Sequence, residues 1–273
     1  SVGAPYYNRT FLVPMLPLFA LVGLGAFARW KRGQLGESRR RLLACLGIAV
    51  VLGLALMLGL YGDRSLLGPI GVVLALWIIC TALVDPLDRL RRRLSLPLAV
   101  LGMTLAHVGL AVTLLGITTM ESRRVERDVS LAPGQQAQLG DYAFRLDSIK
   151  QDIDGPNYTA TRARVVVTRN GKPDVVLLPE QREYDVQQQS LAQAALGVSW
   201  RRDVMVTLGE PVGNGAWSMR LQVRPLMRLV WLGAMCMAGG GLLATLDRRY
   251  RRRREALAQQ QAAAAGAAPG VAS

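Results

Sequence analysis

Residues 96–118 read LPLAVLGMTLAHVGLAVTLLGIT, an apolar run without a single Asp, Glu, Lys or Arg. A transmembrane helix needs about 20 mostly apolar residues, and this run is long enough to be one. Further apolar runs occupy residues 11–27, 42–60, 68–84 and 226–246. The sequence therefore predicts a membrane protein built on an α-helical bundle with five transmembrane helices, four of them within residues 1–118.

Residues 119–225 separate the fourth run from the fifth and are predicted to form an inserted all-β domain. The dipeptide Asn170-Gly171 lies between two β-rich runs, and Asn-Gly is a strong hairpin signal because both turn residues need positive φ. Other short strand candidates alternate with Gly- and Pro-containing turns, a spacing typical of a small antiparallel barrel or sandwich. Residues 185–195 are expected to form a short helix or an insertion, and residues 247–273 a basic tail.

Charged side chains gather at the ends of the apolar runs. The chain has 33 Lys and Arg against 19 Asp and Glu, a net charge of +14. Basic residues concentrate between the first and second runs, between the third and fourth, and after the fifth, whereas residues 119–225 are nearly neutral. Because Lys and Arg near span ends stay on the cytoplasmic side, we predict an external N-terminus and β domain, and a cytoplasmic C-terminus.

The same distribution argues against several classes of function. A nucleic-acid-binding protein would cluster its basic residues on a folded domain, so we expect membrane lipid and not nucleic acid beside these loops. One His and three isolated Cys exclude a zinc site and a disulfide scaffold. The β domain contains neither His nor Cys, and we expect it to dock or scaffold partners rather than to catalyse a reaction.

His107 lies at the middle of the fourth apolar run. Ionisable residues at mid-bilayer usually face the bundle interior and mark ligand or cofactor sites, although a histidine bonded to a neighbouring helix is a second interpretation. Gly102, Gly109 and Gly116 recur every seven residues and form one stripe. His107 lies roughly 200° from Gly109, at about 100° per residue. We therefore expect the glycines to pack on another helix and His107 to face a separate compartment.

The face of the fourth run around His107 is apolar and carries one nitrogen ligand at its centre. A flat hydrophobic porphyrin suits such a surface, and haem iron commonly takes an imidazole axial ligand. The residue pattern thus indicates haem binding, with His107 as the ligand to haem iron.

Seven short motifs follow one another along the chain in a defined order. They are Pro5-Tyr6-Tyr7-Asn8, Ala28-Arg29-Trp30-Lys31-Arg32, His107-Val108-Gly109, Gly155-Pro156-Asn157-Tyr158, Pro179-Glu180-Gln181-Arg182-Glu183-Tyr184, Leu208-Gly209-Glu210 and Arg224-Pro225. In this order they resemble the C-terminal part of CcmF, the large membrane subunit of the bacterial cytochrome c maturation haem lyase. The resemblance covers nearly the whole chain up to the Ala/Gln-rich tail, and residues 187–196 depart from it.

The resemblance implies a haem b in the membrane, held by two transmembrane histidines of which His107 would be the second. The first histidine and the tryptophan-rich haem-binding loop are expected in the remainder of CcmF or in a split-gene partner. It also implies a location in the bacterial inner membrane with the β domain in the periplasm.

The family's activity, as the resemblance implies it, joins haem to the Cys-x-x-Cys-His thiols of apocytochrome c. The chaperone CcmE delivers the haem, a CcmH-type subunit assists, and quinol supplies electrons through haem b to keep haem reduced. We expect this chain to be the haem-binding membrane segment of such a lyase; whether it is itself an enzyme stays open. The alternatives are the related lyase for nitrite-reductase cytochromes and a non-haem scaffold that docks partners through its β domain.

Overall fold

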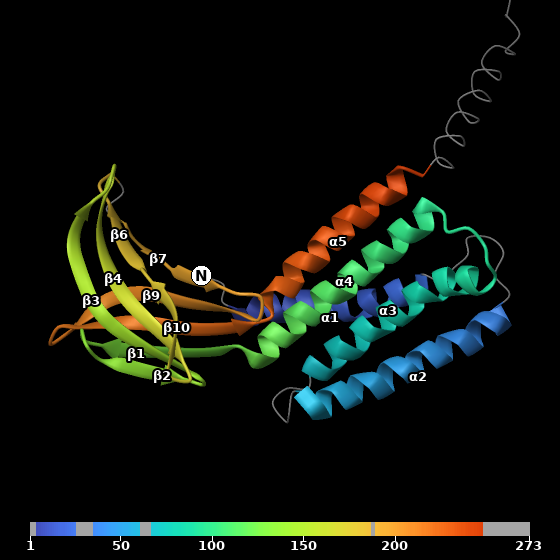
Figure 1. The fold of residues 1–273 in the computed structure, drawn as a ribbon, viewed down its shortest axis with the longest axis horizontal. Coiled ribbons are helices and arrows are strands. Elements are labelled where there is room, and N and C mark those ends of the chain that lie inside the picture. The colour runs from blue at the N-terminus through green and yellow to red at the C-terminus, as the bar shows by residue number, and fades with distance from the viewer. Residues whose placement is uncertain (1–3, 26–34, 61–66, 187–188, 248–273) are drawn as a thin grey trace, which may run out of the picture. The chain divides into compact units, whose positions relative to one another are not determined.

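The computed structural model describes residues 4–25, 35–60, 67–186 and 189–247 (Figure 1). These residues form helices before and after a run of strands. The helices are α1 (Ala4–Gly25), α2 (Leu35–Leu60), α3 (Leu67–Arg91), α4 (Leu98–Arg123) and α5 (Met227–Thr245). The chain divides into a helical unit, built from α1 to α3 with most of α4 and α5, and a β unit that spans residues 116–230.

Over the described residues each predicted apolar run coincides with a helix, and α3 and α4 continue past the apolar stretches. Residues 26–27 of the first run, and the predicted basic tail beyond residue 247, lie outside the described residues. The third run was expected to end at residue 84, whereas α3 continues to Arg91 through Asp85 and Pro86. Within the described residues, α3, α4 and α5 are long and apolar enough to cross a membrane, and α1 contributes a shorter apolar stretch, Pro14–Gly25. The described residues thus include three helices of membrane-spanning length and composition, while the count of five spans stays a prediction.

Tight contacts hold α1, α2 and α3 together. The Trp77 indole of α3 donates a hydrogen bond to the Ala20 carbonyl of α1 at 3.1 Å. Gly23 makes room for this indole, because a Cβ there would overlap the ring. A Cβ on Gly53 of α2 would lie 2.5 Å from Val73 Cγ2 of α3, so this pair also needs a glycine.

The β unit is a two-sheet sandwich of antiparallel strands. Its strands are β1 (Val125–Leu131), β2 (Gln136–Leu139), β3 (Tyr142–Asp154), β4 (Tyr158–Arg169), β5 (Lys172–Leu177), β6 (Glu180–Tyr184), β7 (Ser190–Gln193), β8 (Ala195–Val198), β9 (Arg202–Gly213) and β10 (Ala216–Pro225). One sheet has the order β1-β10-β9-β8; the other has the order β2-β3-β4-β6-β7, with β5 also paired to β4. The long strands β3, β4, β9 and β10 alternate buried and more exposed residues over much of their length. The buried residues of both sheets form one core around Phe144, Val165, Val206 and Leu221.

The predicted hairpin at Asn170-Gly171 is confirmed. Asn170 and Gly171 have φ values of 48° and 76°, and the turn joins β4 to β5. The expectation of a short helix at residues 185–195 was wrong over its described part, because Ser190–Gln193 is strand β7, paired with β6. The alternative expectation, an insertion, stays a prediction. All four β7 residues are exposed, so the strand lacks the alternation of apolar and polar residues that identifies a half-buried strand.

Candidate functional site

The glycine stripe of α4 packs against α5, as predicted. A Cβ on Gly102 would lie 2.5 Å from the Gly240 carbonyl oxygen, and one on Gly109 would lie 2.7 Å from that of Gly233. The glycines of α5 are equally constrained, since a Cβ on Gly240 would lie 2.5 Å from the Gly102 oxygen. The two helices are therefore in backbone contact, which small residues permit in membrane helix pairs.

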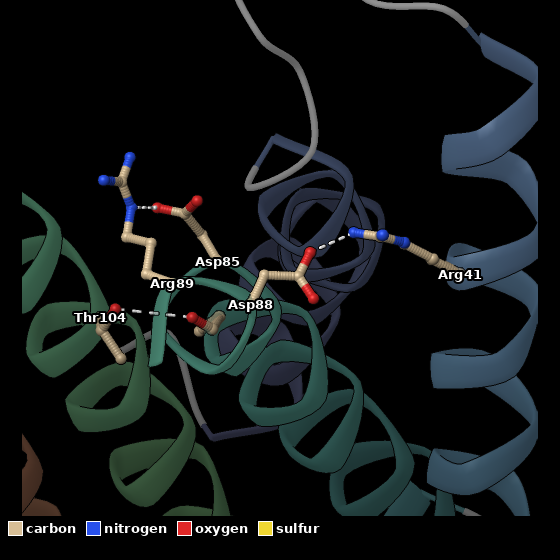
Figure 2. Close-up of polar contacts among 6 residues, drawn as sticks. Arg41, Asp85, Asp88, Arg89 and Thr104 are labelled. Carbon is tan, nitrogen blue, oxygen red and sulfur yellow. Dashed lines mark hydrogen bonds and ion pairs between the residues drawn. The ribbon is translucent and has the colours of Figure 1, made fainter. Parts of the chain in front are cut away.

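His107 lies on the other side of α4, on the face shared with Thr104 and Ala111. The Thr104 hydroxyl lies 3.5 Å from the Ala82 carbonyl oxygen of α3, and Figure 2 shows this contact beside the polar end of α3. Ala111 is fully buried in a cluster with Ile78 of α3 and other apolar residues of the helical unit. The half-buried His107 is within one helical turn of both, so it lies on the α4 face nearer α3 and away from the glycine seam.

A hydrogen bond to its own helix orients the His107 ring. Nδ1 of His107 lies 2.8 Å from the carbonyl oxygen of Met103, one turn earlier. When Nδ1–H donates to this oxygen, Nε2 keeps its lone pair, which can accept a hydrogen bond or bind a metal. Histidines that bind metals almost always use their second ring nitrogen in this way.

The donor set suits a haem better than a bare metal ion. Among the described residues there is no group of three or more His, Cys, Asp or Glu side chains that could hold a metal ion. A porphyrin supplies four equatorial nitrogens itself, so an axial imidazole is the ligand that the protein must add on one side. His107, alone and oriented on an apolar helix, meets this requirement.

An apolar groove of about 380 Å³ lies elsewhere in the helical unit. Leu24 of α1, Leu46 of α2 and Trp77 of α3 contribute to its lining, and none of its lining residues comes from α4. The groove is therefore separate from the His107 face.

An ion pair at the charged end of α3 connects this helix to α2. Arg41 of α2 forms an ion pair with Asp88, and Arg89 Nε donates to Asp85 Oδ2 at 3.0 Å (Figure 2). The charge pattern assigned Arg41 and Arg89 to two different basic loops, and neither ion pair was predicted. The spacing of Asp85 and Arg89, four residues apart on an extended helix, is the signal that could have found one of them.

Comparison with known proteins matches this architecture. The family model described as CcmF C-terminal beta-sandwich matches residues 122–225, the strands between α4 and α5. The Cytochrome c-type biogenesis protein CcmF of Pseudomonas fluorescens is 38% identical over 92% of this chain and 39% of its own length. The chain is similar to the C-terminal part of CcmF. The Pseudomonas aeruginosa protein of the same name is 37% identical, again over 92% of the chain and 39% of its own length.

A solved structure shares the fold of both units. The structure titled Cytochrome c Heme Lyase CcmF superposes with a TM-score of 0.71 at 20% identity, over 89% of this chain and 41% of that chain. The chain thus spans about two fifths of the length of the CcmF relatives it matches. The apolar helices and these relatives together indicate a multi-pass membrane protein, in which the β-sandwich is inserted between α4 and α5.

Proposed function

We propose that this chain is the haem-binding membrane segment of a cytochrome c haem lyase, and that His107 is an axial ligand of a haem b. The observation that carries the proposal is the hydrogen bond from Nδ1 to the Met103 carbonyl oxygen, which leaves Nε2 to bind iron. The names of the relatives give the context, because they describe cytochrome c biogenesis proteins.

In this role the chain's own residues bind and orient the cofactor. The Met103 carbonyl fixes the plane of the imidazole and increases its basicity as a ligand. The backbone contacts of Gly102 and Gly109 with α5 hold α4, and so His107, in a defined position. The apolar neighbours of His107 exclude water, which tunes the reduction potential of a bound haem. Haem itself supplies the electron-transfer chemistry, and the protein supplies ligation and orientation.

The partners follow from this role. The remaining length of a CcmF protein, in the same chain or as a separate subunit, would provide the second haem ligand. Apocytochrome c, the haem chaperone CcmE and a CcmH-type subunit would act with it, and quinol would donate electrons that keep the attached haem ferrous. We further propose that the N-terminus and the β unit are periplasmic.

The visible spectrum of the purified membrane complex tests this proposal. After reduction with dithionite, the wild-type complex should show a b-type α-band, and His107→Ala should remove it. Added imidazole should restore the band, because it replaces the missing side chain without changing the fold. Val108→Ala, a truncation at the next position of the same helix, is the control and should keep the band. An unchanged spectrum in His107→Ala would instead favour a scaffold that binds no haem.

A further inference from the structure

Two segments of the β unit meet where α5 begins. Residues 199–203 form the turn from β8 into β9, and residues 224–228 lead from β10 into α5. The Leu226 amide donates a hydrogen bond to the Arg201 carbonyl oxygen at 3.0 Å, which ties the turn to the start of the helix. We call these two segments the foot of the β unit. Because α5 is long and apolar enough to span a membrane, the foot lies at a membrane surface by chain continuity.

The foot is strongly basic. Its two segments contain four arginines and one aspartate; the arginines are Arg201, Arg202, Arg224 and Arg228. Arg202 contacts other residues of the sandwich: it forms an ion pair with Asp174 and donates from Nε to the Tyr142 hydroxyl at 3.0 Å. The other three arginines give the foot its excess positive charge.

Arg224 and Arg228 retain donors that the described residues do not use. The Nε atoms of both are buried and have no hydrogen-bond partner there. Arg224 donates from Nη2 to Gln222 at 2.8 Å. Arg228 Nε lies 4.0 Å from an oxygen of Asp203, which makes a long ion pair but is too far for a hydrogen bond. A buried N–H without an acceptor costs free energy, and a guanidinium that turned toward an oxyanion would recover it. Arginine is well suited to bind a phosphate through two parallel N–H groups.

Trp200 projects from the same turn and is 77% exposed. A large aromatic ring in open water is unfavourable, whereas tryptophan is enriched at membrane interfaces, where its ring lies at headgroup level and its N–H stays hydrated. Val198, two residues earlier, is also exposed at 52%. The foot thus combines an exposed aromatic ring with arginines that have spare donors.

We propose that the foot binds phospholipid headgroups, with Trp200 in the headgroup layer and with Arg224 and Arg228 on lipid phosphate. The positive charge, the unused donors and the link to a membrane-spanning helix favour lipid over a protein partner. The β unit is then attached to the bilayer surface and not only to the ends of α4 and α5. This inference does not depend on haem, so it and the proposed function can fail independently.

Depth-dependent fluorescence quenching tests the placement of Trp200. A fluorescent amino acid replaces Trp200 in the complete protein, which is reconstituted into bilayers of lipids brominated on their acyl chains. The probe should be quenched several-fold more than the same probe at Val212, which is 62% exposed. Val212 lies on β9 ten residues beyond Arg202, about 33 Å at 3.3 Å per residue. Equal quenching at the two positions would overturn the proposal.

Lipid retention tests the arginines. The protein is washed in detergent, and its bound phospholipid is counted by native mass spectrometry. Arg224→Gln and Arg228→Gln should each weaken retention about fivefold, the effect of about 1 kcal/mol per basic residue at a membrane surface. Arg220→Gln is the control, since Arg220 is exposed and paired with Asp128.

Competition identifies the source of the oxyanion. A phosphate-free glycolipid should fail to displace the bound phospholipid, and so should inorganic phosphate, which lacks acyl chains. Displacement by inorganic phosphate alone, or unchanged retention in both arginine variants, would show that the foot is not a phospholipid site.

Discussion

The orientation of one imidazole decides whether the His107 face can bind iron. His107 could be selected from the sequence because it is the one histidine, in the middle of an apolar run. Its bond to the Met103 carbonyl oxygen could not be predicted, because it depends on the rotamer of the side chain. The alternative interpretation had His107 hydrogen-bonded to a neighbouring helix. In the structure, the Nδ1 partner is instead a carbonyl oxygen of its own helix.

A second residue-scale feature is the carboxylate of Glu180, within the family-like motif at residues 179–184. Glu180 is 6% exposed and accepts hydrogen bonds from Arg162 at 2.5 Å and from Arg182 at 2.8 Å. Burial acts to raise the pKa of Glu180, but the hydrogen bonds from Arg182 and Arg162 outweigh it and leave the pKa below its ordinary value. Ionised Glu180 therefore stabilises the fold.

Replacing this carboxylate should change both stability and its pH dependence. A depressed pKa gives stability that is present above the ordinary Glu pKa of about 4.3 and is lost as pH falls through the folded value. We expect Glu180→Gln to lower the free energy of unfolding of the β unit by about 1–2 kcal/mol at pH 7, and by less in acid. Thermal unfolding of the complete chain, followed by near-UV circular dichroism at several pH values, measures this. Glu183→Gln, at an exposed position on the same strand, should change little.

At the scale of elements, the seam between α4 and α5 depends on the position of each glycine. Gly240 and Gly241 are neighbours on α5, yet a Cβ on Gly240 would lie 2.6 Å from Ala106 N, while one on Gly241 would meet nothing within 4 Å. The seven-residue glycine period predicted a packed face from the sequence. It did not identify α5 as the partner, since a stripe of small residues does not specify which helix fills it.

This contrast gives a matched pair of variants. We expect Gly240→Ile to destabilise the helix pair by about 1–3 kcal/mol or more, because the added atoms must separate the two backbones. Thermal stability of the detergent-solubilised protein measures the effect, and a bound haem should be lost with it. Gly241→Ile adds the same side chain into open space and should be tolerated. Equal loss of stability in the two variants would contradict the backbone contact.

At the scale of the whole molecule, most of the predicted architecture came from the distribution of apolar and charged residues. Apolar runs defined the membrane class, and residues 119–225 could be recognised as β from turns such as Asn170-Gly171. The choice between barrel and sandwich could not be made. It depends on pairings far apart in sequence, such as β1 with β10, which local patterns do not encode. The C-terminal end of α3 could not be predicted from hydropathy either, because the segment 85–91, which contains charged residues, continues the helix beyond its apolar part.

Membrane orientation is the prediction that belongs to this scale. The basic loops predict that the β unit is exported and that the C-terminus stays in the cytoplasm. Alkaline phosphatase is active only after export, so its insertion at Asn214, in the exposed turn between β9 and β10, should give active enzyme in cells. A fluorescent protein that matures only in the cytoplasm should be bright at the C-terminus. The reverse pattern would mean that the charge bias does not set the topology.

The pairing of β1 with β10 places the entrance and the exit of the β unit side by side. Val125 is opposite Val223 in this ladder, so the chain leaves α4 and returns to α5 through adjacent strands. The sandwich is therefore joined to α4 and α5 through one pair of neighbouring strands. An exchange of the entire module between CcmF relatives would require only two neighbouring splice points, and α4 and α5 would keep their lengths.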